Sequence, residues 1–100
     1  MSRDDARRTL VAYDISNDRR RTRLASKLEK YGDRLQYSVF VVDASPAKLI
    51  RMKSEIEEVL DLQKDSVLLC DLGRLTELSE ARFSFLGQSR EITPGEAFVF

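Results

Sequence analysis

The order of strand and helix patterns along the first 72 residues constrains the fold most strongly. Residues 9–15 (TLVAYDI) form an almost continuous apolar stretch, which predicts a central strand covered on at least one face. The predicted elements are a strand at 9–15, a helix at 19–31, an extended chain at 34–43, a helix at 46–60, a strand at 65–72 and a short strand at 82–86. This βαββαβ order with an appended C-terminal strand predicts an α+β, ferredoxin-like sandwich.

Local signals set the boundaries of these elements. Residues 16–18 offer N-cap side chains to the first helix, and Gly32 is predicted to end that helix as a C-cap. Ser45 and Pro46 begin the second helix. The extended chain is long for one strand, so a bend or tight hairpin is expected near residues 36–38. Tyr13 and Tyr37 are predicted to be core or sheet-face residues.

A length of 100 residues suits one domain, so residues 1–100 are assigned to a single ferredoxin-like unit. The polar residues 1–8 are expected to be a flexible N-terminus. The stretch lacks the apolar region of a signal peptide, and no run of 18 apolar residues follows, which favours a cytoplasmic protein without a membrane segment. Residues 73–100 contain Phe83, Phe85 and the apolar end AFVF, and this tail is predicted to lie at a homodimer interface.

Two absences restrict the chemistry. The chain has no histidine, which excludes an imidazole base and a histidine metal ligand. It has one cysteine, Cys70, which excludes an intrachain disulfide and a multi-cysteine metal site. Cys70 lies in the apolar run VLLC and is predicted to be an inert core residue. Any catalysis must therefore use carboxylates, lysine, tyrosine, serine or a metal ion held by oxygen.

Charge is distributed unevenly although the net charge is zero. Residues 1–34 carry ten Lys and Arg against six Asp and Glu, and residues 35–100 carry seven against eleven. A local cationic surface points to a polyanion, although a solvated helix face is the competing interpretation. The predicted nucleic-acid-binding residues are Arg19, Arg20, Arg23, Lys27, Lys30 and Arg34.

Asp14 is the candidate catalytic residue, because it places a carboxylate at the end of the apolar strand and shortly before the arginines. A structural group that accepts backbone hydrogen bonds from the next turn is the competing interpretation. One carboxylate is a poor site for Mg²⁺, which usually takes one or two carboxylates and water. A two-fold homodimer would bring two copies of Asp14 to one shared Mg²⁺.

Two motifs resemble the Cas-two family of small CRISPR-associated proteins. The first is YDISNDRRRTRL at residues 13–24, and the second is YGDRLQYSVF at residues 31–40. Both occur at the family spacing in a chain of family length. The strand usually begins almost at the initiator methionine in this family, whereas several polar residues precede it here.

The resemblance implies a ferredoxin-like homodimer that binds duplex DNA together with the CRISPR integrase, known as Cas-one, during spacer acquisition. It also implies a Mg²⁺-dependent endonuclease acting on single-stranded RNA or on DNA, with Asp14 as the metal ligand. Ser38 and Phe40 are placed by the resemblance in the cleft of the dimer. A non-catalytic structural adaptor of the integrase complex is the alternative. Arg20, Arg23, Lys27 and Lys30 form a basic stripe along the predicted helix, and this stripe disfavours a small-molecule-binding regulatory domain.

Overall fold

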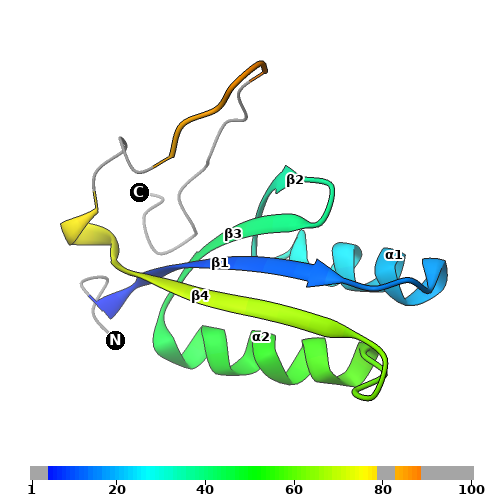
Figure 1. Cartoon of the computed structure of the whole chain (residues 1–100). Helices are drawn as coiled ribbons and strands as arrows, with labels where there is room; N and C mark the ends of the chain where they lie inside the picture. The colour runs from blue at the N-terminus through cyan, green and yellow to red at the C-terminus, as the bar shows by residue number, and fades with distance from the viewer. Residues whose placement is uncertain (1–4, 79–82, 89–100) are drawn as a thin grey trace.

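The computed structural model describes residues 5–78 and 83–88 of the chain. Its centre is a four-stranded antiparallel sheet in the order β2-β3-β1-β4 (Figure 1). The strands are β1 (Arg7–Asp14), β2 (Gly32–Gln36), β3 (Val39–Ala44) and β4 (Ser66–Arg74). Two helices, α1 (Asp18–Leu28) and α2 (Pro46–Val59), and a short 3-10 helix (Leu75–Glu77) complete the described elements. This order of strands confirms the predicted ferredoxin-like α+β sandwich.

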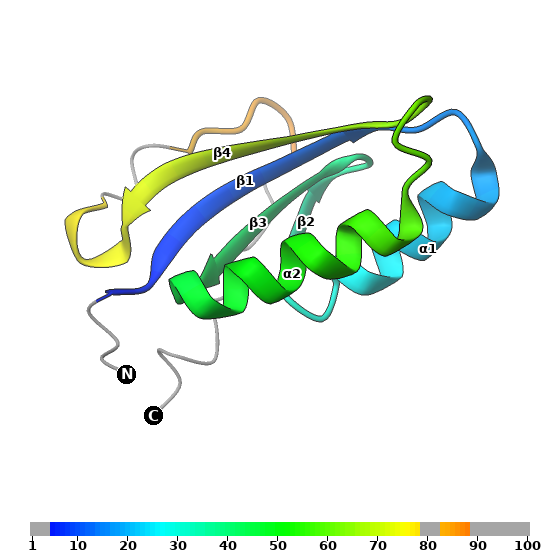
Figure 2. The same ribbon diagram turned by 90° about the horizontal axis from the view of Figure 1, so that it is seen from below.

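Both helices lie on one face of the sheet (Figure 2). The core forms where alternate residues of β1 and β3 point toward these helices, and it is completed by one apolar stripe from each helix. Leu24 and Leu28 of α1 and Met52 and Ile56 of α2 are buried there. The completely buried side chains of this core are Val11, Leu24, Leu28, Phe40, Val42 and Met52.

Side-chain caps begin both helices where the sequence predicts them. The Asn17 side chain accepts a hydrogen bond from the Arg20 backbone N–H at 2.9 Å, and Ser45 accepts one from Lys48 at 3.3 Å. The end of α1 differs from the prediction, because Glu29 is its C-cap and has ordinary helical backbone angles. The predicted C-cap residue, Gly32, instead opens β2.

The hairpin expected near residues 36–38 is confirmed. Tyr37 and Ser38 form the connection between β2 and β3, and the register shifts between Arg34 and Gln36. At the other end of the hairpin, Gly32 pairs with Val42. A Cβ atom on Gly32 would lie 2.1 Å from the Val41 carbonyl oxygen, so glycine permits this close approach of two strands.

Three sequence predictions need correction. Cys70 is exposed, because β4 is an edge strand and Cys70 pairs with Leu10 on the face away from the helices. Arg7 and Arg8 belong to β1 rather than to an N-terminal tail, since Asp71 and Asp43 pair with them. Residues 83–88 form no strand, so the predicted strand at 82–86 is absent from its described part. The remainder of the predicted dimer-forming tail, including the AFVF end, lies outside the described residues.

An ion pair fastens α1 to the turn before β4. Arg20 donates two hydrogen bonds to the Asp65 carboxylate at 2.7 and 3.0 Å, and the Asp65 side chain is completely buried. Asp65 also accepts a hydrogen bond from the Asp61 backbone N–H at 2.9 Å. The Arg20 guanidinium holds the pKa of Asp65 below its usual value of 3.8, and the Asp61 N–H adds to this effect against the opposing effect of desolvation.

We expect Gly32→Ala to destabilise the fold by about 1–3 kcal/mol, because the added methyl group meets backbone atoms of β3 that cannot rotate away. Urea unfolding measures the change. Gln36→Ala, an exposed site on the same strand, is the control. Equal free energies of unfolding for the two variants would show that β2 and β3 can move apart at Gly32 without loss of stability.

We expect Asp65→Asn to lower the stability at neutral pH, since it leaves the Arg20 guanidinium without its carboxylate. The pKa of Asp65 is lower in the folded chain than in the unfolded chain, so its contribution is complete above the unfolded pKa of about 4. That contribution disappears as the pH falls through the folded pKa. Thermal unfolding of both proteins from pH 7 down to acid should therefore show a difference that narrows below about pH 4. A difference in stability between the two proteins that does not change with pH would mean that Asp65→Asn acts through packing and not through the lost charge.

Candidate nucleic-acid interface and metal site

Asp14 lies at the C-terminal end of the central strand, opposite Ser66 of β4. The alternation along β1 places it on the same face as Leu10 and Ala12, away from the helices. Its side chain is exposed. Among residues 5–78 and 83–88, no side chain or backbone group bonds to the Asp14 carboxylate. A free carboxylate at this position is available to a ligand from outside the subunit.

The turn after β1 is held by other residues. Asn17 caps α1, and Arg21 donates from Nη1 to the Ile15 carbonyl oxygen at 2.8 Å. Arg21 also forms an ion pair with Asp18. The pKa of Arg21 is raised chiefly by its hydrogen bond to Asp18 and then by that to Tyr37. The interpretation of Asp14 as a brace for this turn therefore has no hydrogen bond to support it in the described part of the chain.

Oxygen donors near Asp14 fit a hard cation only in part. No group of three or more Asp, Glu, His or Cys side chains able to hold a metal comes together within the described ranges. Asp14 offers one exposed carboxylate, and Mg²⁺ commonly binds through one or two carboxylates with water completing its shell. The carboxylate is of the type that Mg²⁺ prefers, and the described part of one subunit supplies a single such ligand at this place.

The six predicted nucleic-acid-binding residues divide into three groups. Arg20 is paired with buried Asp65, and Lys27 lies 3.6 Å from Glu55 of α2, so both hold the fold together. Arg34 is exposed but bonds to the Tyr37 carbonyl oxygen. The side chains that are exposed and unpaired within the described residues are those of Arg19, Arg23 and Lys30.

The two predicted cleft residues are not exposed with Asp14. Phe40 is completely buried and stacks on Tyr13 with ring centroids 6.3 Å apart, on the side of the sheet that faces the helices. Ser38 is half-buried, and its carbonyl oxygen accepts a hydrogen bond from the Tyr13 N–H at 3.0 Å. A role for either residue in a dimer cleft stays a prediction.

Two neighbours of the site were missed by the sequence reasoning. Arg21 falls between the basic and the apolar stripes of α1, and its contacts depend on how the turn before the helix folds. Tyr37 was assigned to the core or a sheet face, yet it is 68% exposed. The expected tight hairpin was the available signal, because a residue in a two-residue turn leaves the alternation of the strands.

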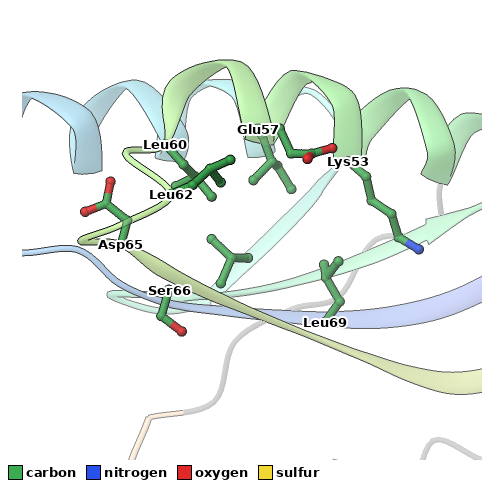
Figure 3. A pocket seen from close by; sticks show the side chains of 9 residues that line it. Lys53, Glu57, Leu60, Leu62, Asp65, Ser66 and Leu69 are labelled. Atoms are coloured by element: carbon green, nitrogen blue, oxygen red, sulfur yellow. The ribbon is translucent and has the colours of Figure 1, made fainter.

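A groove of about 400 Å³ lies elsewhere, between α2 and β4 (Figure 3). Leu60, Leu62 and Leu69 supply much of its apolar lining, and Lys53 and Glu57 of α2 stand at its side. The Asp65 carboxylate beside it is already bonded to Arg20. Asp14 does not line this groove, although its pairing partner Ser66 does. No described helix is long and apolar enough to cross a membrane.

Comparison with known proteins agrees with the sequence motifs. The profile of the family described as CRISPR associated protein Cas2 matches residues 7–78. A Synechocystis protein named CRISPR-associated endoribonuclease Cas2 3 is 40% identical over 58 residues, which cover 58% of this chain and 63% of that protein. A Rhodospirillum rubrum protein of the same name is 39% identical over 69 residues, covering 64% of this chain and 73% of that protein.

Two solved structures share the fold. A crystal structure of the hypothetical protein TT1823 from Thermus thermophilus aligns with a TM-score of 0.74 and 30% identity, covering 88% of this chain and 99% of that chain. Streptococcus pyogenes Cas2, crystallised at pH 6.5, aligns with a TM-score of 0.71 and 28% identity, covering 80% and 99%. The family match spans β1 through the short 3-10 helix, and with it the whole sheet, both helices and Asp14, so this chain belongs to the CRISPR associated protein Cas2 family.

Proposed function

We propose that this protein is a metal-dependent endonuclease of CRISPR adaptation that acts as a homodimer on nucleic acid. The observation that carries the proposal is the free, exposed Asp14 carboxylate at the end of the central strand, directly before the basic helix α1. The names of the relatives, which are endoribonucleases, support phosphodiester cleavage as the reaction class.

The β4 side of the sheet face that carries Asp14 supports the homodimer. Leu68 of β4 is 60% exposed and pairs with Ala12, while Leu10 pairs with exposed Cys70, all on the face that carries Asp14. An apolar patch beside an unpaired carboxylate suits a second copy of the same surface. A two-fold axis near the end of β1 would bring the two Asp14 residues together. The C-terminal tail as a further part of this interface stays a prediction.

In this dimer, the two Asp14 carboxylates would hold one Mg²⁺. The bound ion supplies Lewis-acid polarisation of a phosphoryl oxygen, which replaces the missing histidine chemistry. Arg19, Arg23 and Lys30 would bind flanking phosphates, because each is exposed and has no ion-pair partner in the described part of the chain. Arg20 and Lys27 are paired with Asp65 and Glu55, whose carboxylates offset their charges, so they are expected to add less to phosphate binding.

A second candidate function is a non-catalytic adaptor that binds duplex DNA together with the CRISPR integrase. One observation favours it: the free basic residues of α1 can bind phosphates without any chemistry at Asp14, and one subunit supplies a single carboxylate. The adaptor and the nuclease differ in one respect that can be measured, namely whether the protein cleaves nucleic acid in a reaction that depends on Mg²⁺ and Asp14.

We expect Asp14→Asn to reduce Mg²⁺-dependent cleavage of single-stranded RNA and duplex DNA by about 100-fold or more, because the amide keeps the shape but loses the charge that attracts the cation. Adding EDTA to the wild type should have the same effect. Glu58→Gln, an exposed carboxylate on α2, is the matched control and should retain activity. Cleavage that persists in purified Asp14→Asn would reject the catalytic role of Asp14, whereas a wild type that binds duplex DNA without any Mg²⁺-dependent cleavage would favour the adaptor.

We expect duplex-DNA binding to weaken steeply with salt, with a slope near −0.9 for each phosphate neutralised. Replacing Arg23 and Lys30 together by alanine should flatten that slope by about two units. Replacing Arg51 and Lys53, two exposed cations of α2, removes the same charge elsewhere and should leave the slope nearly unchanged. Equal effects of the two double variants, measured by fluorescence anisotropy across a salt series, would mean that α1 is an ordinary solvated face.

A further inference from the structure

Tyr37 lies at the tip of the β2–β3 hairpin. Its side chain is exposed to solvent, yet both its hydroxyl and its backbone carbonyl oxygen are hydrogen-bonded. Its hydroxyl accepts a hydrogen bond from Arg21 Nε at 3.1 Å. Its carbonyl oxygen accepts bonds from Arg34 Nε and Nη2 at 3.2 and 2.9 Å, and from the Tyr13 hydroxyl at 3.3 Å. With 68% of the residue exposed, at least one face of the ring has room for a partner.

Two positively charged side chains, Arg21 and Arg34, lie close to the Tyr37 ring. The guanidinium carbons of Arg21 and Arg34 lie 5.8 and 5.5 Å from the centroid of the Tyr37 ring, within the range of cation–π attraction. Arg21 bonds the hydroxyl at the edge of the ring, so it does not cover the ring fully. Exposing a large aromatic side chain forfeits the free energy of burying it.

An exposed aromatic ring beside fixed cations is the combination that binds single-stranded nucleic acid. The ring stacks on a base, and the cations meet the neighbouring phosphates. Bases inside a duplex already stack on both sides, whereas an unpaired base has a free face. The chemistry around Tyr37 therefore fits an unpaired nucleobase better than a duplex.

The hairpin tip is joined to the end of β1 on both sides of Asp14. The Tyr13 N–H donates to the Ser38 carbonyl oxygen at 3.0 Å, and Arg21, which holds the Tyr37 hydroxyl, also bonds the Ile15 carbonyl oxygen. Tyr13 and Ile15 are the chain neighbours of Asp14. A base resting on Tyr37 would thus have its phosphates near the end of β1 where Asp14 lies.

We propose that Tyr37, positioned by Arg21 and Arg34, is a stacking platform for an unpaired nucleobase of a single-stranded substrate. The inference rests on the proposed function, because the strand held on Tyr37 is the strand whose phosphates approach Asp14. The proposal adds a base-contacting residue outside the basic stripe of α1. It makes single strands the preferred ligand of the region formed by the hairpin tip and the end of β1.

The test measures binding without cleavage. Fluorescence anisotropy in EDTA follows a labelled oligouridylate of about ten nucleotides, a length within the range of single-strand sites. Tyr37→Ala should weaken binding about 5- to 100-fold, the loss expected for one stacked base. Tyr37→Phe keeps the ring and should stay close to wild type. Ile50→Ala is the matched control, since Ile50 on α2 is also 68% exposed, and it should bind as the wild type does.

Two further ligands separate stacking from other effects. An abasic strand of the same length should bind the wild type and Tyr37→Ala equally, and so should a blunt duplex RNA. The proposal would be overturned if Tyr37→Ala weakened binding of the abasic strand as much as binding of the oligouridylate. It would also be overturned if Tyr37→Ala left oligouridylate binding unchanged. A change in oligomeric state on sedimentation of Tyr37→Ala would overturn it as well, by assigning the ring to a protein interface.

Asp14→Asn separates this inference from the proposed function. If Tyr37→Ala loses affinity in EDTA while Asp14→Asn still cleaves, the platform stands and the catalytic role of Asp14 fails. If Asp14→Asn loses cleavage while Tyr37→Ala binds normally, the platform fails and the proposed function stands. The two measurements use different readouts, so neither result can be mistaken for the other.

Discussion

The position of β1 between β3 and β4 is the constraint on which the rest of the structure depends. On one edge β3 pairs with residues Arg7–Ala12, and on the other edge β4 pairs with the strand as far as Asp14. One face of β1 supplies the core residues Val11 and Tyr13, and the other face carries Asp14. A carboxylate at the end of such a strand is held at a defined place while its oxygens stay free. The rigid support and the exposed chemistry therefore come from the same element.

The arginines around this strand have different roles although they are adjacent in sequence. Arg20 is directed to buried Asp65, which anchors α1 to the turn before β4. Arg21 is directed to the Ile15 carbonyl oxygen and the Tyr37 hydroxyl, which joins the start of α1 to the hairpin tip. Arg19 and Arg23 remain exposed. Successive residues of a helix point about 100° apart, so a run of arginines reaches several partners at once.

Much of the fold could be predicted from the sequence, because apolar periodicity and capping residues are local signals. The pattern of 9–15 and the Ser45-Pro46 start of α2 are of this kind. Cys70 and Tyr37 were misplaced because their exposure depends on tertiary structure, namely on β4 being an edge strand and on the turn between β2 and β3. Likewise, Arg20 looks like any surface arginine until the fold brings Asp65, 45 positions away, against it. Asp14 could be singled out because it is the one charge in the apolar stretch 9–15, but the absence of hydrogen bonds to its carboxylate within the described residues is visible in the structure alone.

The free carboxylate also connects the two halves of the proposed function. Two Asp14 side chains brought together across a two-fold axis would repel each other, and the repulsion grows as the apolar patch around Leu68 excludes water. A shared cation would remove that repulsion and add attraction to both subunits. By linkage, a cation that binds the dimer more tightly than the monomer stabilises the dimer by the same factor. In such an arrangement the catalytic ion is also part of the interface, and the basic side chains of two α1 helices are brought to one surface only when the site is complete. Phosphate binding and catalysis would then depend on the same association of subunits, although the residues responsible for each are different.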